Sequence, residues 1–158
     1  MHSYKIAGLV LLLGSGALAS LMLSRFEQRR YRQAEGFLAL LRHIRLQIDC
    51  FSLPVSRILE TLPEQISEGA ALPTDAQDFD ALLDGTTLLL TPPMCELLIA
   101  FGADLGTSYR EDQLRCCDYY ITRFAPLCER MREELPRRMR LALLLPLALA
   151  LSLALLLI

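Results

Sequence analysis

Hydrophobic positions are concentrated at the two ends of the chain. Residues 6–23 include no charged residue, and residues 141–158 are almost entirely Leu and Ala. A helix rises about 1.5 Å per residue, so each run is roughly 27 Å long, close to the hydrocarbon thickness of a bilayer. Lipid offers the backbone no hydrogen-bond partner, which favours helix in both runs. We therefore predict transmembrane helices at 5–24 and 141–158, with a helical domain at 25–140 between them.

Between these runs, apolar residues recur at steps of three and four, which is typical of amphipathic helices. In the segment 28–48 this face consists of Phe37, Leu40, Leu41, Ile44 and Ile48. In the last long helix it consists of Leu114, Cys117, Ile121, Phe124, Cys128, Met131 and Leu135. Pro126 and Pro136 fall inside that second pattern, so kinks or breaks are expected there. Gly36 is expected to be a mild weak point of the first helix.

Shorter helices are predicted between the two long ones, and no strand-like alternation is present. They lie near 54–62, 64–71, 75–83 and 92–105. Their expected N-terminal caps are Ser52 or Leu53, Thr74 or Asp75, and Thr91. Ser108 and Glu111 have the spacing of a capping box at the start of the last helix. The fold class that follows is all-α, an antiparallel helical bundle between an N-terminal and a C-terminal transmembrane helix.

Arginine residues are clustered beside both apolar runs. The positive-inside rule then places the central domain in the cytosol and both termini across the membrane. The arginines expected at the surface of the lipid bilayer are Arg29, Arg30, Arg32, Arg137, Arg138 and Arg140. A cleaved signal peptide is the rival interpretation, because Ala17-Leu18-Ala19 resembles a cleavage site and would leave Ser20 as the new N-terminus. The apolar run continues beyond that site and basic residues follow it, which opposes cleavage.

Acidic residues dominate the middle of the chain. Nine of them, and no basic residue, lie between Arg57 and Arg110. This acidic lobe is either a solvated surface or a docking surface for a basic partner. Its candidate docking residues are Glu60, Glu64, Glu68, Asp78 and Asp80. The formal net charge of the whole chain is −2, which argues against a nucleic-acid partner.

Signatures of catalysis are absent from the sequence. Gly14-Ser15-Gly16 lies within the first apolar run, where the spacing of Gly16 and Ser20 fits close helix packing instead of phosphate binding. His43 has no carboxylate or thiol in register and is expected at an edge of the core. The five cysteines include no CxxC pair and are interpreted as reduced thiols that pack as small apolar residues. We expect no enzyme activity, cofactor, metal or catalytic residue.

One segment of the chain consists of Leu105-Gly106-Thr107-Ser108-Tyr109-Arg110-Glu111-Asp112-Gln113. It resembles the characteristic segment of the stage III sporulation protein AB family. Tyr109 stands where that family commonly has Asp. The order of the front half also resembles the family: an apolar run, a basic turn, a long helix, and Ser52-Leu53-Pro54 before a short helix.

The resemblance implies a non-enzymatic subunit of a sporulation channel in the mother-cell membrane around the forespore, acting as platform or assembly factor. Its implied partners are sister membrane proteins of a channel complex. Its domain is expected to be similar to the helical domain of the type II secretion and type IV pilus inner-membrane platform protein. Arg110, Glu111, Asp112 and Gln113 are expected either to contact partners or to form local salt bridges with the acidic lobe. An alternative function is a membrane-anchored adaptor that docks a cytosolic ATPase through the acidic lobe.

Overall fold

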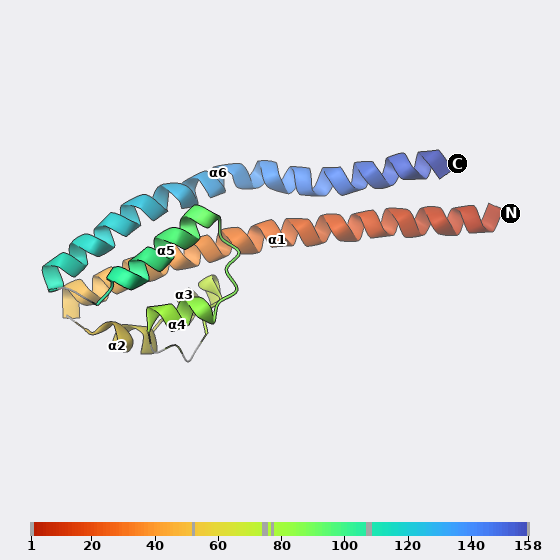
Figure 1. Ribbon diagram of the computed structural model, residues 1–158. Coiled ribbons are helices and arrows are strands. Elements are labelled where there is room, and N and C mark those ends of the chain that lie inside the picture. Colours follow the sequence, from red (N-terminus) through yellow and green to blue (C-terminus); the bar gives the residue numbers. More distant parts are fainter. Residues whose placement is uncertain (1, 52, 74–75, 77, 107–108, 158) are drawn as a thin grey trace. The chain divides into compact units, whose positions relative to one another are not determined.

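A computed structural model describes the chain except residues 1, 52, 74–75, 77, 107–108 and 158, and shows six α-helices in the described part (Figure 1). They are α1 (His2–Phe51), α2 (Val55–Glu60), α3 (Glu64–Ala70), α4 (Phe79–Asp84), α5 (Pro92–Asp104) and α6 (Arg110–Leu157). Helices account for 85% of the structure, and the described residues contain no strand. The prediction of an all-α fold is confirmed, and the architecture is consistent with a helical bundle.

The chain divides into two compact units. Unit 1 consists of residues 1–29 and 132–158, and unit 2 of residues 30–131. Each of the long helices α1 and α6 therefore contributes one part to each unit.

The two apolar runs predicted to cross a membrane, 5–24 and 141–158, lie within α1 and α6. In the portion of the chain that the structure describes, no helix is both long enough and apolar enough to cross a membrane. The structure therefore does not confirm the two predicted transmembrane helices.

In unit 1, α1 and α6 meet through small residues. A Cβ atom placed on Gly16 would lie only 2.7 Å from the Cβ of Ala150 and 3.3 Å from the carbonyl oxygen of Pro146. The buried Ser20 hydroxyl lies 2.9 Å from the carbonyl oxygen of Gly16 and 3.0 Å from that of Leu143. Its one hydrogen can be donated to either carbonyl. The close helix contact predicted from the spacing of Gly16 and Ser20 is confirmed.

Unit 2 has one apolar core to which all six helices contribute. The predicted face of α1 is buried in full, as are Met94, Leu98 and Phe101 of α5. Cys117, Phe124 and Cys128 from the predicted stripe of α6 are also buried, with Leu114, Ile121 and Met131 packed against the core. Leu135, the last residue of that stripe, lies in unit 1 and is not part of this core. Within unit 2, helical periodicity therefore identified the core-facing side of each long helix.

Gly36 is a point of contact between helices, not the weak point expected from the sequence. A Cβ atom on Gly36 would lie 2.3 Å from the backbone nitrogen of Ala70 and 2.5 Å from the carbonyl carbon of Gly69. The backbones of α1 and α3 can approach this closely only because residue 36 has no side chain.

One turn before Gly36, the buried side chain of Gln33 ties α1 to two other segments. Its Nε2 donates to the carbonyl oxygens of Ala70 (3.3 Å) and Thr87 (2.9 Å), and its Oε1 accepts from the backbone N–H of Leu89 at 2.7 Å. Because the nitrogen and the oxygen of this buried amide both form hydrogen bonds, the side chain avoids the free-energy cost of a buried unpaired polar group. Gln33 therefore fixes α3 and the 87–89 segment against the same stretch of α1.

Two predictions about the helices need correction, and one is confirmed. The helix expected over 75–83 begins only at Phe79, because the carboxylate of Asp78 accepts from the backbone N–H of Ala81 at 2.7 Å and so caps it there. The alternative cap Leu53 is wrong, because the N-cap of α2 (Val55–Glu60) is Pro54. The caps proposed from sequence at 52, 74–75 and 108 lie outside the described residues. α5 begins at Pro92 directly after Thr91, as predicted, although the Thr91 side chain makes no capping hydrogen bond.

Kinks or breaks were expected at Pro126 and Pro136, and a break is wrong at both positions, because α6 continues through them. A proline inside a helix removes one backbone hydrogen bond and costs about 3 kcal/mol or more. Around Pro126 this cost is offset by burial of Phe124 and Cys128, which lie on either side of it and anchor consecutive turns in the core.

Candidate functional site

The segment 105–113 connects α5 to α6 at one end of unit 2. The backbone N–H of Leu105 donates to the carbonyl oxygens of Phe101 and Gly102, which closes α5. Gly106 then adopts a φ of +84°, a conformation that favours glycine. α6 begins at Arg110, and its first turn carries two acidic side chains that suit the positive end of the helix dipole.

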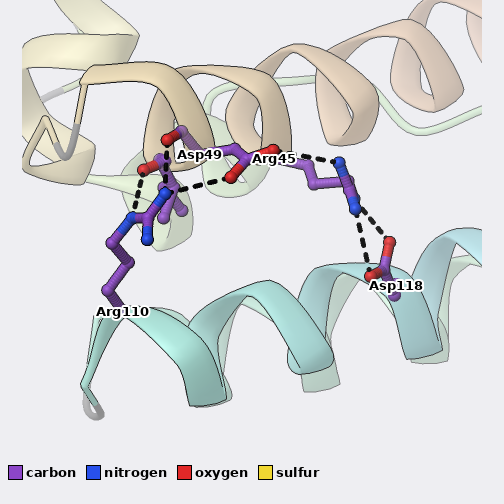
Figure 2. Close-up of polar contacts among 5 residues, drawn as sticks. Arg45, Asp49, Arg110 and Asp118 are labelled. Carbon is purple, nitrogen blue, oxygen red and sulfur yellow. Dashed lines mark hydrogen bonds and ion pairs between the residues drawn. The ribbon is translucent and has the colours of Figure 1, made fainter.

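Arg110 binds the C-terminal end of α1 (Figure 2). Its Nη2 donates to the backbone carbonyl of Asp49 at 2.5 Å and to the Asp49 carboxylate at 3.0 Å. Its Nε donates to the backbone carbonyl of Ile48 at 3.3 Å. Both carbonyls belong to the last four residues of α1, whose carbonyls have no partner within the helix. Arg110 therefore acts as a capping group supplied from a distant part of the chain.

A second arginine extends this contact along the two helices (Figure 2). Arg45 on α1 lies 3.8 Å from Asp49 and makes two hydrogen bonds with the carboxylate of Asp118 on α6. The Asp118 hydrogen bond, followed by the charge of Asp118, raises the pKa of Arg45. Residue numbers rise along α1 while those of their partners fall along α6, so the helices run antiparallel here. Arg110, Asp49, Arg45 and Asp118 together form what we call the arginine clasp.

The four residues 110–113, which the sequence analysis identified as candidates, differ in their contacts. Arg110 is engaged within the chain, and its ionic partner is Asp49, which lies outside the acidic lobe. Glu111 and Asp112 are exposed, and Gln113 is partly buried. These last three residues remain candidates for partner contact.

Asp112 and Gln113 border a surface hollow of about 440 Å³ between α5 and α6. The hollow is lined by Asp104, Asp112, Gln113, Arg115, Cys116, Tyr119 and Tyr120. The Tyr120 hydroxyl donates to the carboxylate of Asp104 at 2.6 Å. Burial, followed by this hydrogen bond, raises the pKa of Tyr120 to about 12, so the hydroxyl remains a donor at neutral pH. The hollow was not predictable from the sequence, because its residues come from two helices and follow no local motif.

Aromatic rings form the wall of this hollow. Tyr119 and Tyr120 meet edge to face, with ring centroids 5.1 Å apart, and Tyr120 meets Phe101 of the core in the same way at 5.5 Å. The guanidinium of Arg123 lies over the ring of Tyr119, 4.4 Å from its centroid. This wall is therefore continuous with the core and already accommodates one cation on its outer ring.

The five candidate docking residues of the acidic lobe are all exposed, and they lie on α2, on α3 and at the start of α4. Glu60 lies 3.7 Å from Arg57, and Asp78 is the cap of α4. Glu64 is in the first turn of α3, where an anion stabilises the helix dipole. Some of these acidic residues thus have a local structural role in addition to any binding role.

The arginines expected at a membrane surface are divided between the two units. Arg29, Arg137, Arg138 and Arg140 belong to unit 1, whereas Arg30 and Arg32 belong to unit 2. Arg138 forms an ion pair with Glu134 one turn earlier, at 2.7 Å. The other arginines of unit 1 named here have exposed side chains.

The cysteines and His43 show no sign of activation for catalysis. Burial raises the pKa of Cys117 and of Cys128 to about 12, which keeps both as neutral thiols. They pack in the core as expected, but Cys50 is exposed, so the packing interpretation is wrong for that residue. His43 is partly buried, and burial lowers its pKa. The described residues contain no group of His, Cys, Asp and Glu side chains suited to a metal ion.

The described part of the chain is an all-helical protein with charged and aromatic side chains at its polar sites. The family model of stage III sporulation protein AB matches residues 79–158, just over half of the chain. The chain therefore belongs to the stage III sporulation protein AB family, which implies a role in sporulation. This is a family of structural or assembly proteins that is not known to be enzymatic. Neither the curated proteins nor the solved structures include a match.

Proposed function

We propose that this protein is a non-enzymatic subunit of a sporulation channel complex in the mother-cell membrane, where it acts as a platform or assembly factor for sister membrane proteins. Family membership supports the sporulation role. The division of the chain into two units supports the rest, with one unit proposed for anchoring and the other for binding partners.

The observation that carries the proposal is the apolar surface of unit 1. Large exposed side chains on α1 include Leu11 (74% exposed), Leu18 (61%) and Met22 (67%). Those on α6 include Leu141, Leu143, Leu144, Leu145, Leu147, Leu149, Leu151, Leu153 and Leu155. Soluble monomers rarely expose a contiguous apolar surface of this kind. Lipid and neighbouring membrane proteins are the surroundings that would cover it.

Unit 2 supplies a surface of the opposite kind. Its core is closed, and its exterior carries the acidic lobe, the hollow between α5 and α6, and the first turn of α6. A platform protein needs a rigid domain that positions such a surface. The arginine clasp and the Gln33 network give unit 2 this rigidity by tying α6, α3 and the 87–89 segment to α1.

Isolation from sporulating cells tests the proposed function. The tagged full-length chain, extracted from the membrane fraction in mild detergent, is expected to bring down other membrane proteins made during sporulation. A deletion strain is expected to fail in sporulation and to recover when the full chain is restored. Recovery of the protein alone in the soluble fraction, or normal sporulation of the deletion strain, would contradict the proposal.

Cysteine labelling in intact cells tests the topology that goes with this function. Cys50 is exposed in unit 2 and serves as a natural reporter once the other four cysteines are replaced. A membrane-impermeant thiol reagent should leave Cys50 unlabelled until the cells are permeabilised. A Ser3→Cys variant without the native cysteines should label from outside. Labelling of Cys50 in intact cells would place unit 2 outside and exclude a cytosolic platform.

A second function, an adaptor for a cytosolic ATPase, is favoured by the exposure of all five candidate docking residues in the acidic lobe. Such binding would be electrostatic and should weaken steeply as salt rises. Co-isolation of an ATPase that is lost in Glu64→Arg and Glu68→Arg variants would support this function. Binding that is insensitive to salt and to both substitutions would exclude it.

A further inference from the structure

We propose that the hollow between α5 and α6 is a socket for an arginine or lysine side chain presented by a protein partner in the complex. This inference rests on the proposed function, because it assigns one contact of that assembly. It also separates the residues of the 105–113 segment by role: Arg110 holds the bundle together, whereas Asp112 and Gln113 face the socket.

The lining of the hollow has the chemistry that a cationic side chain requires. Asp104 and Asp112 supply two carboxylates, from the end of α5 and the start of α6. Tyr119 and Tyr120 supply aromatic rings, whose faces attract cations. Arginine and lysine combine a charged head with an apolar stem, and such side chains pack well where carboxylates and rings alternate.

The position of the Asp104 carboxylate is fixed before any partner binds. The Tyr120 hydroxyl holds Oδ2 of Asp104 at 2.6 Å, and Tyr120 itself is only 7% exposed. The phenol is protonated at neutral pH, and burial raises its pKa further, to about 12, so the hydroxyl acts as a donor that orients the carboxylate. A preorganised anion of this kind binds a cation with little loss of conformational entropy.

The chain itself shows a cation bound to this wall. Arg123 places its guanidinium over the Tyr119 ring, 4.4 Å from the centroid, while Tyr119 remains 49% exposed. Arg115 also borders the hollow, so the site is not a uniform acidic patch. The mixed lining favours a single inserted side chain with hydrogen-bonding capacity over a diffuse basic surface, and Gln113 adds an amide to that lining.

The surface beside the hollow includes an exposed face of α5 on which a partner segment could pack. On α5, the residues Glu96, Ile99, Ala100, Ala103 and Asp104 are all exposed and recur at helical spacing, so they form one face. The face has an apolar centre, where Ile99 is 58% exposed and the two alanines allow close approach, and a carboxylate at each end. A helix with an apolar stripe and basic ends matches this pattern.

Site-specific photo-crosslinking in sporulating cells tests the socket. The probe is p-benzoylphenylalanine in place of Arg115, an exposed residue at the rim, in the otherwise intact full-length chain. We expect one discrete adduct whose partner peptide contains arginine or lysine. The control probe replaces Arg42, which is exposed on α1 and does not line the hollow, and it should not give that adduct.

Charge variants decide whether the hollow causes the contact. Asp112→Arg should reduce the adduct by about tenfold, and the isosteric Asp112→Asn should reduce it less. Glu133→Arg, a charge reversal at an exposed residue outside the hollow and the acidic lobe, should leave it unchanged. Reversing the partner's basic residue to Asp should restore the adduct in Asp112→Arg. Circular dichroism of each purified variant checks that the helices are intact.

Several results would overturn the socket: no adduct, an adduct with lipid or with a second copy of this chain, a partner peptide without a basic residue, or an adduct that ignores Asp112→Arg. Co-isolation of sister membrane proteins, measured without crosslinking in the same cells, keeps the two proposals apart. If co-isolation persists while the socket tests fail, the proposed function stands and the socket is wrong.

Discussion

Replacing Gly36 by Ala should destabilise unit 2, although alanine is the better helix former. In an exposed helix this exchange would stabilise by about 1 kcal/mol. Here the new Cβ would lie 2.3 Å from the backbone nitrogen of Ala70, 2.5 Å from the carbonyl carbon of Gly69 and 2.7 Å from the Cα of Ala70. Because ordinary contacts between carbon atoms begin near 3.5 Å, α3 would have to retreat by roughly 1 Å.

That retreat has two further consequences that set the magnitude. It would stretch the Gln33 bond to the Ala70 carbonyl, which is already 3.3 Å long, and would open space around the fully buried Ala70 side chain. Overpacking of a core costs about 1–3 kcal/mol, and a clash with backbone cannot be relieved by a rotamer change. The backbone clash places the cost at the upper end of that range, about 3 kcal/mol. After subtracting the propensity gain of about 1 kcal/mol, we expect a net loss of about 2 kcal/mol, or roughly 8–16 °C in Tm for a domain of this size.

The neighbouring glycine provides a matched control. A Cβ on Gly69 would lie 3.5 Å from the Cα of Gly36, an ordinary van der Waals contact. Gly69→Ala therefore inserts the same methyl group at the same helix pair without a clash, and should leave the stability unchanged or slightly raise it. Thermal unfolding of the full chain in mild detergent, followed by far-UV circular dichroism, compares the two variants. A Gly36→Ala protein as stable as the Gly69→Ala protein would refute the assigned packing of α1 against α3.

Four further outcomes can be checked on the same protein. Gln33→Ala leaves two carbonyls and one N–H without their partner, so unfolding in denaturant should show a loss of about 3 kcal/mol. Arg110→Ala should lower the free energy of unfolding by only about 1 kcal/mol, because the side chain is about half exposed. Arg110→Lys should recover little of this loss, since one ammonium group cannot make the same set of hydrogen bonds as the planar guanidinium. The pKa of Cys117 rises from 9.0 to about 12 on folding. The contribution of this thiol to the free energy of unfolding is therefore complete below pH 9 and declines as pH rises through 12. Denaturation at a series of pH values should detect the decline. In native protein Cys50 should react with a thiol reagent within the mixing time of the assay while Cys117 is protected, and equal rates would contradict the burial assigned to Cys117.

Sequence patterns predicted the features of this fold that depend on local periodicity. The five apolar residues spaced along 37–48 face the core because a helix that buries one of them must bury the others. The start of α5 was predictable for a similar reason, since two prolines suit only the first turn. Gly16 and Ser20 were correctly paired because small residues four positions apart share one helix face.

Features that depend on the tertiary partner were not predictable. Gly36 was interpreted as a weak point because nothing near it in sequence indicates that Ala70 lies against it. A kink or break was expected at Pro126, and the continuity of α6 there was not predictable because the burial that compensates for the proline depends on other helices. The hollow could not be predicted because Asp104 belongs to α5 and Tyr119 to α6, and no sequence spacing relates residues of different helices.

Arg110 is the most informative case, because the sequence did contain a signal for its partner. The last turn of α1 contains no basic residue and does contain Asp49, an anion at the negative end of a helix dipole. Such a terminus is stabilised by a cation from elsewhere, and the described structure places Arg110 there with bonds to the Asp49 carboxylate and to two terminal carbonyls. The presence of Arg110 in the segment that resembles the family is therefore explained by its structural role, which is to cap the end of α1. Its neighbours on α6, Asp112 and Gln113, line the hollow to which we assign a partner contact.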